Sequence, residues 1–240
     1  MDLSTTYLGL KLANPLMVGA SPFCDHVHVA RQLQDAGAAA LVMRSLFEEQ
    51  IDAEQRGWLH NVEGVSDSSA EAASYFPTYT EYQLTPDHYL RQLEALKRAL
   101  TIPVIGSLNG ARPGVVLFNR FYQPAFNLED LEVQPQLKLS TRSELLLRLR
   151  WLAIISPHLR GSLAVSGGVH AAEDAIKAIL AGAHGVQLVS TLLKNGPRLV
   201  AALIDALRLW LDEHGYENMD QLRGAMNLKR CPDPAAFERA

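Results

Sequence analysis

The stretch GSLAVSGGVHAAEDAIKAILAGAHGVQLVSTLLKNGP, residues 161–197, decides the fold. An apolar run at Leu163–Val165 leads into two glycines, and the pattern then predicts a helix from Ala171 to Ala181. Gly182 ends that helix, because glycine adopts the left-handed conformation that closes helices. A second apolar run follows at Val186–Val189. Strand, helix and strand in this order indicate a parallel βα repeat.

The rest of the chain repeats this alternation. The phrase AGAAALV at 36–42 resembles AGAHGVQLV at 181–189, which indicates repeated βα units. Short, continuously apolar runs are typical of strands buried on both faces. We expect about six such strands, at residues 16–20, 38–42, 103–107, 115–118, 163–165 and 186–189. The sequence therefore predicts an α/β fold, an incomplete barrel of the TIM (β/α)8 type, formed as a single domain by residues 1–240.

One connection is too short for a regular barrel. The strands around Val104 and Val116 are joined only by NGARPG, residues 109–114. Neighbouring parallel strands need a crossover of about a dozen residues or more. Either these two strands are antiparallel, or they are not neighbours, or a segment is missing between them.

Composition excludes several classes of function. The 240 residues carry a net charge of −4 without a basic run, so we expect no nucleic-acid partner. Two cysteines far apart favour a reducing cytoplasm over a disulfide framework. No apolar run reaches the roughly 20 residues of a membrane span, and the first residues do not have the pattern of a signal peptide.

Two loops could hold a phosphate group. Gly167 and Gly168 follow one predicted strand and precede a helix, while Val189 and Ser190 follow the next strand. Backbone N–H groups at such turns and helix starts attract anions, and β/α barrels commonly bind phosphate between two successive loops of this kind. A tight turn without a ligand is the alternative for the glycine pair.

A metal site is not expected. Cys24, Asp25, His26 and His28 lie close in sequence, but positions two apart on a helix do not face each other. A capping aspartate followed by solvent-facing histidines explains them better.

Other polar residues end strands. Arg44 and Ser45 follow the second strand, where a substrate contact and a salt bridge at the rim are equally plausible. Asn119 follows the strand near Val116 and could bind a flat heterocycle or cap a loop. The long polar segment 48–85 contains aromatic residues that could cover a ligand or pack on the barrel: Tyr75, Phe76, Tyr79 and Tyr82.

With these motifs the chain resembles the dihydroorotate dehydrogenase family. The similarity starts in YLGLKLANPL (7–16) and GAS (19–21), and continues through AVSGGV (164–169), LAGA (180–183), VQLVS (186–190) and KNGP (194–197). It covers most of residues 1–110 and 115–225. It implies an eight-stranded barrel enzyme of pyrimidine biosynthesis that oxidises dihydroorotate to orotate with FMN.

The resemblance also implies roles for individual residues. FMN would be contacted by Ala20, Ser21, Ser45, Asn119, Gly167, Gly168, Val189 and Ser190. Arg44 and Asn119 would contact a small substrate similar to dihydroorotate.

The chain departs from this family in its middle. Arg44 stands where the family has lysine, and strands four and five are missing at the 109–115 junction, with the loop that carries the catalytic base and a lysine near the flavin. The catalytic residue is therefore unknown. Three readings follow: a flavoprotein oxidoreductase, a non-catalytic remnant that binds FMN or another phosphate, or a phosphate-binding barrel lyase or isomerase. The open strand edges could pair in a homodimer.

Overall fold

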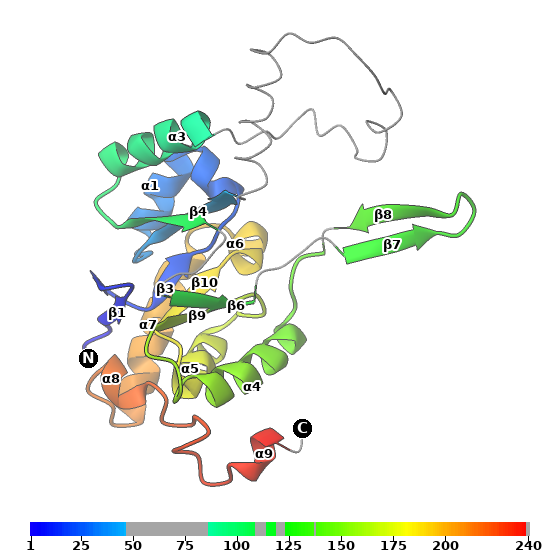
Figure 1. Ribbon diagram of the computed structural model, residues 1–240. Helices are drawn as coiled ribbons and strands as arrows, with labels where there is room; N and C mark the ends of the chain where they lie inside the picture. Colours follow the sequence, from blue (N-terminus) through cyan, green and yellow to red (C-terminus); the bar gives the residue numbers. More distant parts are fainter. Residues whose placement is uncertain (47–85, 109–113, 119–122, 137, 239–240) are drawn as a thin grey trace, which may run out of the picture.

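The computed structural model describes residues 1–46, 86–108, 114–118, 123–136 and 138–238 (Figure 1). Its centre is a parallel six-stranded sheet with the order β5-β4-β3-β10-β9-β6. The strands are β3 (Leu16–Val18), β4 (Leu41–Leu46), β5 (Val104–Leu108), β6 (Gly114–Leu117), β9 (Ser162–Ser166) and β10 (Gly185–Leu188). This is the order 3-2-1-8-7-6 of a barrel without strands four and five, so the predicted incomplete α/β barrel is confirmed.

The short connection is explained by the position of its two strands. β5 and β6 are not neighbours but lie at opposite edges of the sheet, which was one of the three alternatives. Six flat strands would separate their outer strands by about 24 Å. Six Cα–Cα steps from Leu108 to Gly114 reach only about 20–22 Å. The sheet must therefore curl into an open barrel for these strands to be joined.

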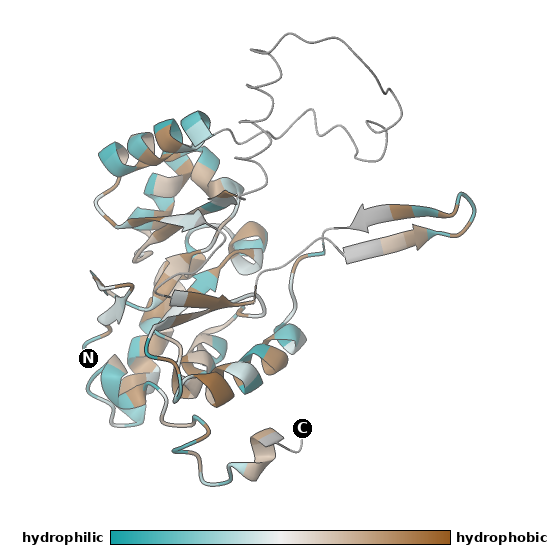
Figure 2. Ribbon diagram, in the orientation of Figure 1, coloured by the Kyte–Doolittle hydropathy of each residue, from teal (hydrophilic) through white to brown (hydrophobic). Residues whose placement is uncertain are grey.

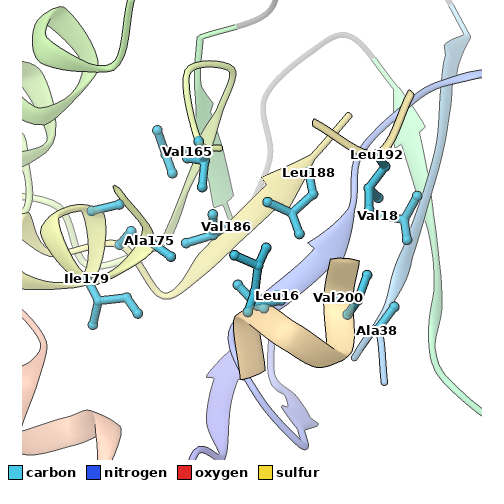
Figure 3. Packing of buried hydrophobic residues seen from close by; sticks show 14 of the residues in the cluster. Leu16, Val18, Ala38, Val165, Ala175, Ile179, Val186, Leu188, Leu192 and Val200 are labelled. Carbon is cyan, nitrogen blue, oxygen red and sulfur yellow. The ribbon is translucent and has the colours of Figure 1, made fainter. Parts of the chain in front are cut away.

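Helices follow the strands as the sequence patterns predict. They are α1 (Val27–Asp35), α3 (Pro86–Ala99), α4 (Leu145–Ile155), α5 (Ala172–Ala181), α6 (Ser190–Asn195), α7 (Leu199–Glu213), α8 (Met219–Leu222) and α9 (Ala235–Glu238), with short 3-10 turns η1 (Pro22–Asp25) and η2 (Arg142–Glu144). Leu16, Val18, Val186 and Leu188 from the strands pack against helix residues such as Val200 (Figure 3). Figure 2 shows both apolar and polar residues along α1 and α3, as expected of helices with one buried face.

Two hairpins complete the described structure. β1 (Thr5–Tyr7) and β2 (Leu10–Leu12) are antiparallel, and Tyr7 and Leu12 belong to a second small core. β7 (Gln123–Asn127) and β8 (Glu132–Gln136) form an antiparallel hairpin that projects from the body (Figure 1). The sequence suggested a hairpin within 131–139, and the structure corrects this because β8 pairs with residues that precede it.

Within the described residues, no helix is both long and apolar enough to cross a membrane.

Candidate functional site

The loops after β3, β10 and β9 lie next to one another at the carboxyl end of the sheet. Gln187 of β10 pairs with Ser166 of β9, and the Gly19 N–H donates to the Leu188 carbonyl at 3.1 Å. The residues that follow these strands are therefore neighbours. The structure brings together three groups that the sequence predicted separately: Ala20 with Ser21, Val189 with Ser190, and Gly167 with Gly168.

The glycine pair is required by its surroundings. Both glycines have φ of +82°, and a Cβ on Gly168 would lie 2.6 Å from the backbone nitrogen of Leu145. A Cβ on Gly167 would lie 3.0 Å from Nη2 of Arg148. The start of α4 thus packs directly behind this loop, so the loop is held close to its neighbours whether or not a ligand binds.

Arg148 fixes the loop from inside the protein. This residue is only 7% exposed, its Nε donates to the Ser166 carbonyl at 2.5 Å, and its Nη1 donates to the Glu144 carbonyl at 2.5 Å. Sequence reasoning missed it, because an arginine in a helix that is rich in leucine and arginine reads as solvent-exposed.

Ser140 joins the two phosphate-loop candidates. It is buried, its Oγ accepts the Gly168 N–H at 3.1 Å, and its own N–H donates to Oγ of Ser190 at 3.0 Å. Nε2 of His170 lies 2.8 Å from the Ser140 carbonyl. Because Ser190 accepts a hydrogen bond from Ser140, the hydrogen of its own hydroxyl remains to be donated elsewhere. No motif marks Ser140 in the sequence.

The two helix starts at this end differ in how their polar groups are satisfied. At α5, Oδ2 of Asp174 accepts the N–H groups of His170 and Ala171 at 3.0 Å each, and Oδ1 pairs with Arg142 at 2.8 Å. The first N–H groups of α6 have no partner within their helix. Oγ1 of Thr191 is buried there and has no hydrogen-bond partner among the described residues. Polar groups without a partner thus concentrate at the start of α6.

The loop after β3 presents a small surface. Ala20 is exposed, whereas Ser21 is buried and its hydroxyl donates to the Gly19 carbonyl at 2.8 Å. A Cβ on Gly19 would lie 2.7 Å from the Val189 side chain. Ser21 therefore stabilises the turn, and Ala20 is the residue that this loop offers to a ligand.

Arg44 and Ser45 both have partners. Nη2 of Arg44 lies 2.7 Å from Oδ1 of Asp25, and Gln92 donates to the same carboxylate oxygen at 3.3 Å. The interpretation of Asp25 as a helix cap is therefore wrong, since its carboxylate pairs with Arg44 and α1 has no side-chain cap. Oγ of Ser45 lies 2.8 Å from Oγ of Ser107, a residue at the end of β5 that the sequence analysis missed.

The described part of the chain contains no metal cluster, and its Cys24 is not a reactive thiol. No three His, Cys, Asp or Glu side chains there are grouped to bind a metal ion. Cys24 is buried, its thiol donates to the Val42 carbonyl at 3.1 Å, and burial raises the pKa of this thiol to about 11. Asn119 and the aromatic residues of segment 48–85 lie outside the described residues.

The fold and these loops define an incomplete parallel β/α barrel with three neighbouring loops held together at its carboxyl end. No family model matches the chain. It is similar, at 20% identity, to the catalytic subunit of dihydroorotate dehydrogenase B (NAD(+)) of Thermoplasma volcanium, in an alignment of 294 residues that covers 93% of this chain and 98% of that relative.

Shorter matches point to the same family. A putative dihydroorotate dehydrogenase A (fumarate) of Streptococcus uberis is 34% identical over 62 residues, which are 26% of this chain and 20% of that protein. A dihydroorotate dehydrogenase (quinone) of Allorhizobium ampelinum is 44% identical over 57 residues, which are 24% of this chain and 16% of that protein. The chain is therefore a distant homologue of the dihydroorotate dehydrogenases.

The long alignment also measures what is missing. Since 93% of 240 residues is about 223, about 70 of the 294 aligned positions have no residue of this chain opposite them. At about 30 residues for each βα unit, that is the length of two units.

Proposed function

We propose that this chain is a flavoprotein of the dihydroorotate dehydrogenase type that binds FMN at the carboxyl end of its open barrel but oxidises dihydroorotate slowly or not at all. The observation that carries the binding proposal is the Ser140 bridge, which holds the loop after β9 and the loop after β10 together in one cradle. The residues present fit a phosphate group, because they combine glycines, the Ser190 hydroxyl with its free hydrogen and the Thr191 hydroxyl, which has no partner in the part of the chain that the structure describes.

The phosphate of FMN would be held by the loops after β9 and β10. The Ser190 hydroxyl and the first N–H groups of α6 would donate to it. Lys194 brings a positive charge nearby, since its Nζ lies 3.5 Å from the Ser140 carbonyl. The Gly168 N–H already donates to Ser140, so we infer that Gly168 shapes the cradle more than it binds the anion.

The ring of FMN, which supplies the hydride-accepting chemistry, would lie toward Ala20 and Ser45. Arg44 is held beside this region by Asp25. A guanidinium is planar and forked where an ammonium is compact, so Arg44 offers a substrate carboxylate a different geometry from the lysine of the resembled family. Its ion pair with Asp25 further weakens its attraction for an anionic substrate.

The ionisable side chains described near this cradle already have partners: Asp25 pairs with Arg44, and Nε2 of His170 lies 2.8 Å from the Ser140 carbonyl. The Cys24 thiol, with its pKa raised to about 11, stays protonated at neutral pH. The hydroxyls of Ser45 and Ser107 bond to each other without a carboxylate or histidine that any described contact places beside them. We infer that the missing two βα units carried the base, which is why turnover should be slow or absent.

The first experiment is a flavin titration of the purified full-length chain. We expect FMN to bind with a quenched and shifted flavin spectrum, and the Ser190→Ala variant to bind it at least about tenfold more weakly, the loss of one charge-assisted hydrogen bond. Arg208→Gln, on the outside of α7, is the control and should bind like the wild type. A chain that ignores added FMN would refute the proposal.

A second experiment separates binding from catalysis. Under anaerobic conditions, dithionite should bleach the bound flavin, whereas excess dihydroorotate should leave it oxidised over many minutes. Rapid bleaching by dihydroorotate would refute the loss of catalysis while leaving FMN binding intact.

We also infer that two copies associate through the edge where the barrel is open. Val115 on β6 and Leu146, Leu147 and Trp151 on α4 are exposed on this part of the molecule, which would face the missing units in a complete barrel. Sedimentation of wild-type protein should show a dimer that the double variant Leu147→Gln, Trp151→Gln shifts toward monomer. A monomeric wild-type chain would refute this association.

A further inference from the structure

A cavity lies at the opposite end of the sheet from the proposed FMN cradle. It measures about 280 Å³ and is lined by the turn after α4 at Ser156, by His184 directly before β10, and by the tail segment 223–230. Because parallel strands share one direction, residues that precede β10 lie at the amino end, whereas Val189 and Ser190 follow it at the carboxyl end. A molecule bound here would not touch the first site.

The wall of this cavity is strongly cationic. Arg223, Lys229 and Arg230 all line it, and no carboxylate is among its lining residues. Within the described part of the chain, neither Lys229 nor Arg230 forms a salt bridge; Nζ of Lys229 donates only to the Pro157 carbonyl at 3.3 Å. Arg223 pairs with Asp220, which does not line the cavity, whereas Lys229 and Arg230 have no carboxylate partner among the described residues, so the wall as a whole attracts an anion.

His184 adds a neutral donor to the same wall. Its Nδ1 accepts the Leu163 N–H at 3.1 Å, so the hydrogen of the neutral ring is on Nε2. Burial, and then the charge of Arg223, lower the pKa of this histidine, so the ring stays neutral at pH 7.

Part of this wall is fixed before any ligand arrives. Nη2 of Arg223 donates to Oγ1 of Thr5 at 3.0 Å, and that hydroxyl donates to the His184 carbonyl at 3.0 Å. Oδ1 of Asn227 accepts the N–H groups of both Lys229 and Arg230 at 3.1 Å. Binding an anion would therefore require little rearrangement of Arg223 or of the backbone at Lys229 and Arg230, which favours affinity.

Arg223 has an additional feature that its structural contacts do not explain. Its Nη2 is paired with Asp220 at 2.8 Å and with Thr5, yet its Nε is buried without a hydrogen-bond partner among the described residues. Buried polar atoms are nearly always paired, so an orphaned one beside a cavity is a sign of a missing ligand or water.

We propose that this cavity binds a small molecule through a phosphate monoester group. A phosphate dianion matches several cations better than a single carboxylate does, and the forked guanidinium groups of Arg223 and Arg230 suit its oxygens. The volume is sufficient for a group attached to the phosphate, and Pro157 contributes apolar surface to the wall around the cations. The proposal is independent of FMN binding at the other end.

The test measures binding of defined phosphates by calorimetry. The probes are inorganic phosphate, ribose 5-phosphate and malonate, each titrated into the full chain at low ionic strength. We expect saturable binding of ribose 5-phosphate, weaker binding of inorganic phosphate and none of malonate. Equal affinity for both phosphates would identify free phosphate as the ligand and overturn the part of the proposal that concerns an attached group.

Matched variants locate the site. Lys229→Gln with Arg230→Gln changes two exposed side chains and should weaken ribose 5-phosphate binding at least tenfold, whereas Lys97→Gln with Arg208→Gln removes the same charge elsewhere and should not. FMN titration should give the same affinity in both double variants, which shows that the fold and the other site are intact. No saturable binding to the wild type, or equal loss in both double variants, would overturn the proposal.

Discussion

The close packing behind the glycine pair can be measured by replacing Gly168 with alanine. The new Cβ would lie 2.6 Å from the Leu145 nitrogen and 2.9 Å from its Cα, both backbone atoms that cannot move away cheaply. The φ of +82° adds the strain of a left-handed conformation, about 1–2 kcal/mol. Overpacking in a filled site typically costs about 1–3 kcal/mol more. We therefore expect Gly168→Ala to lower the free energy of unfolding by about 2–5 kcal/mol.

Gly215, which follows α7, provides a matched control for this prediction. Its φ is +71°, but a Cβ there would meet nothing within 4 Å. Gly215→Ala should therefore cost only the conformational strain, about 1–2 kcal/mol. Urea unfolding followed by circular dichroism measures both variants, with unchanged m-values as the check on two-state behaviour. Equal destabilisation of the two variants would refute the packing argument.

Three further predictions concern the side chains of Arg148, Cys24 and His184, which are buried or partly buried. Arg148→Met should destabilise the protein by about 2–4 kcal/mol in the same urea assay, because the carbonyls of Ser166 and Glu144 lose their donor; a neutral result would show that these bonds contribute little. The Cys24 thiol, with its pKa raised to about 11, should react with a disulfide reagent at neutral pH far more slowly in native than in urea-unfolded protein, and comparable rates would contradict its burial. Because the pKa of His184 is lowered in the folded protein, the unfolded chain takes up a proton at a higher pH than the folded chain does. The free energy of unfolding that His184 contributes is therefore present above its unfolded pKa of 6.5 and is lost as the pH falls below it. His184→Gln should flatten this part of the profile of unfolding free energy against pH, and an unchanged slope would contradict the lowered pKa.

The sequence predicted the barrel well because barrel strands are local signals. Apolar runs that end in glycine or polar residues mark each strand, and all six predicted strands occur in the parallel sheet. The impossibly short join at 109–114 could be recognised from length alone. The position of β5 and β6 at opposite edges of the sheet depends on pairing between distant strands, so the sequence leaves it as one of three alternatives.

The candidate site was harder to predict, since its supporting residues carry no pattern. Ser140 is a lone serine before a capping box, and nothing local says that it bonds to residues 28 and 50 positions away. Asp25 precedes a helix, and its position predicts a helix cap, but its carboxylate pairs with Arg44, 19 positions later. Contacts of this kind come from the tertiary fold, so sequence periodicity does not reveal them.

The pairing of β3 with β10 has a consequence for how the chain is made. Leu16 of β3 lies opposite Val186 of β10, so the seam between the two halves of the sheet cannot form until about 170 further residues have been synthesised. At about 5–20 residues per second, β3 waits on the order of ten seconds or more on the ribosome with one edge unpaired. The first half of the chain, β3 to β5, is therefore the part that needs protection from misassembly during translation.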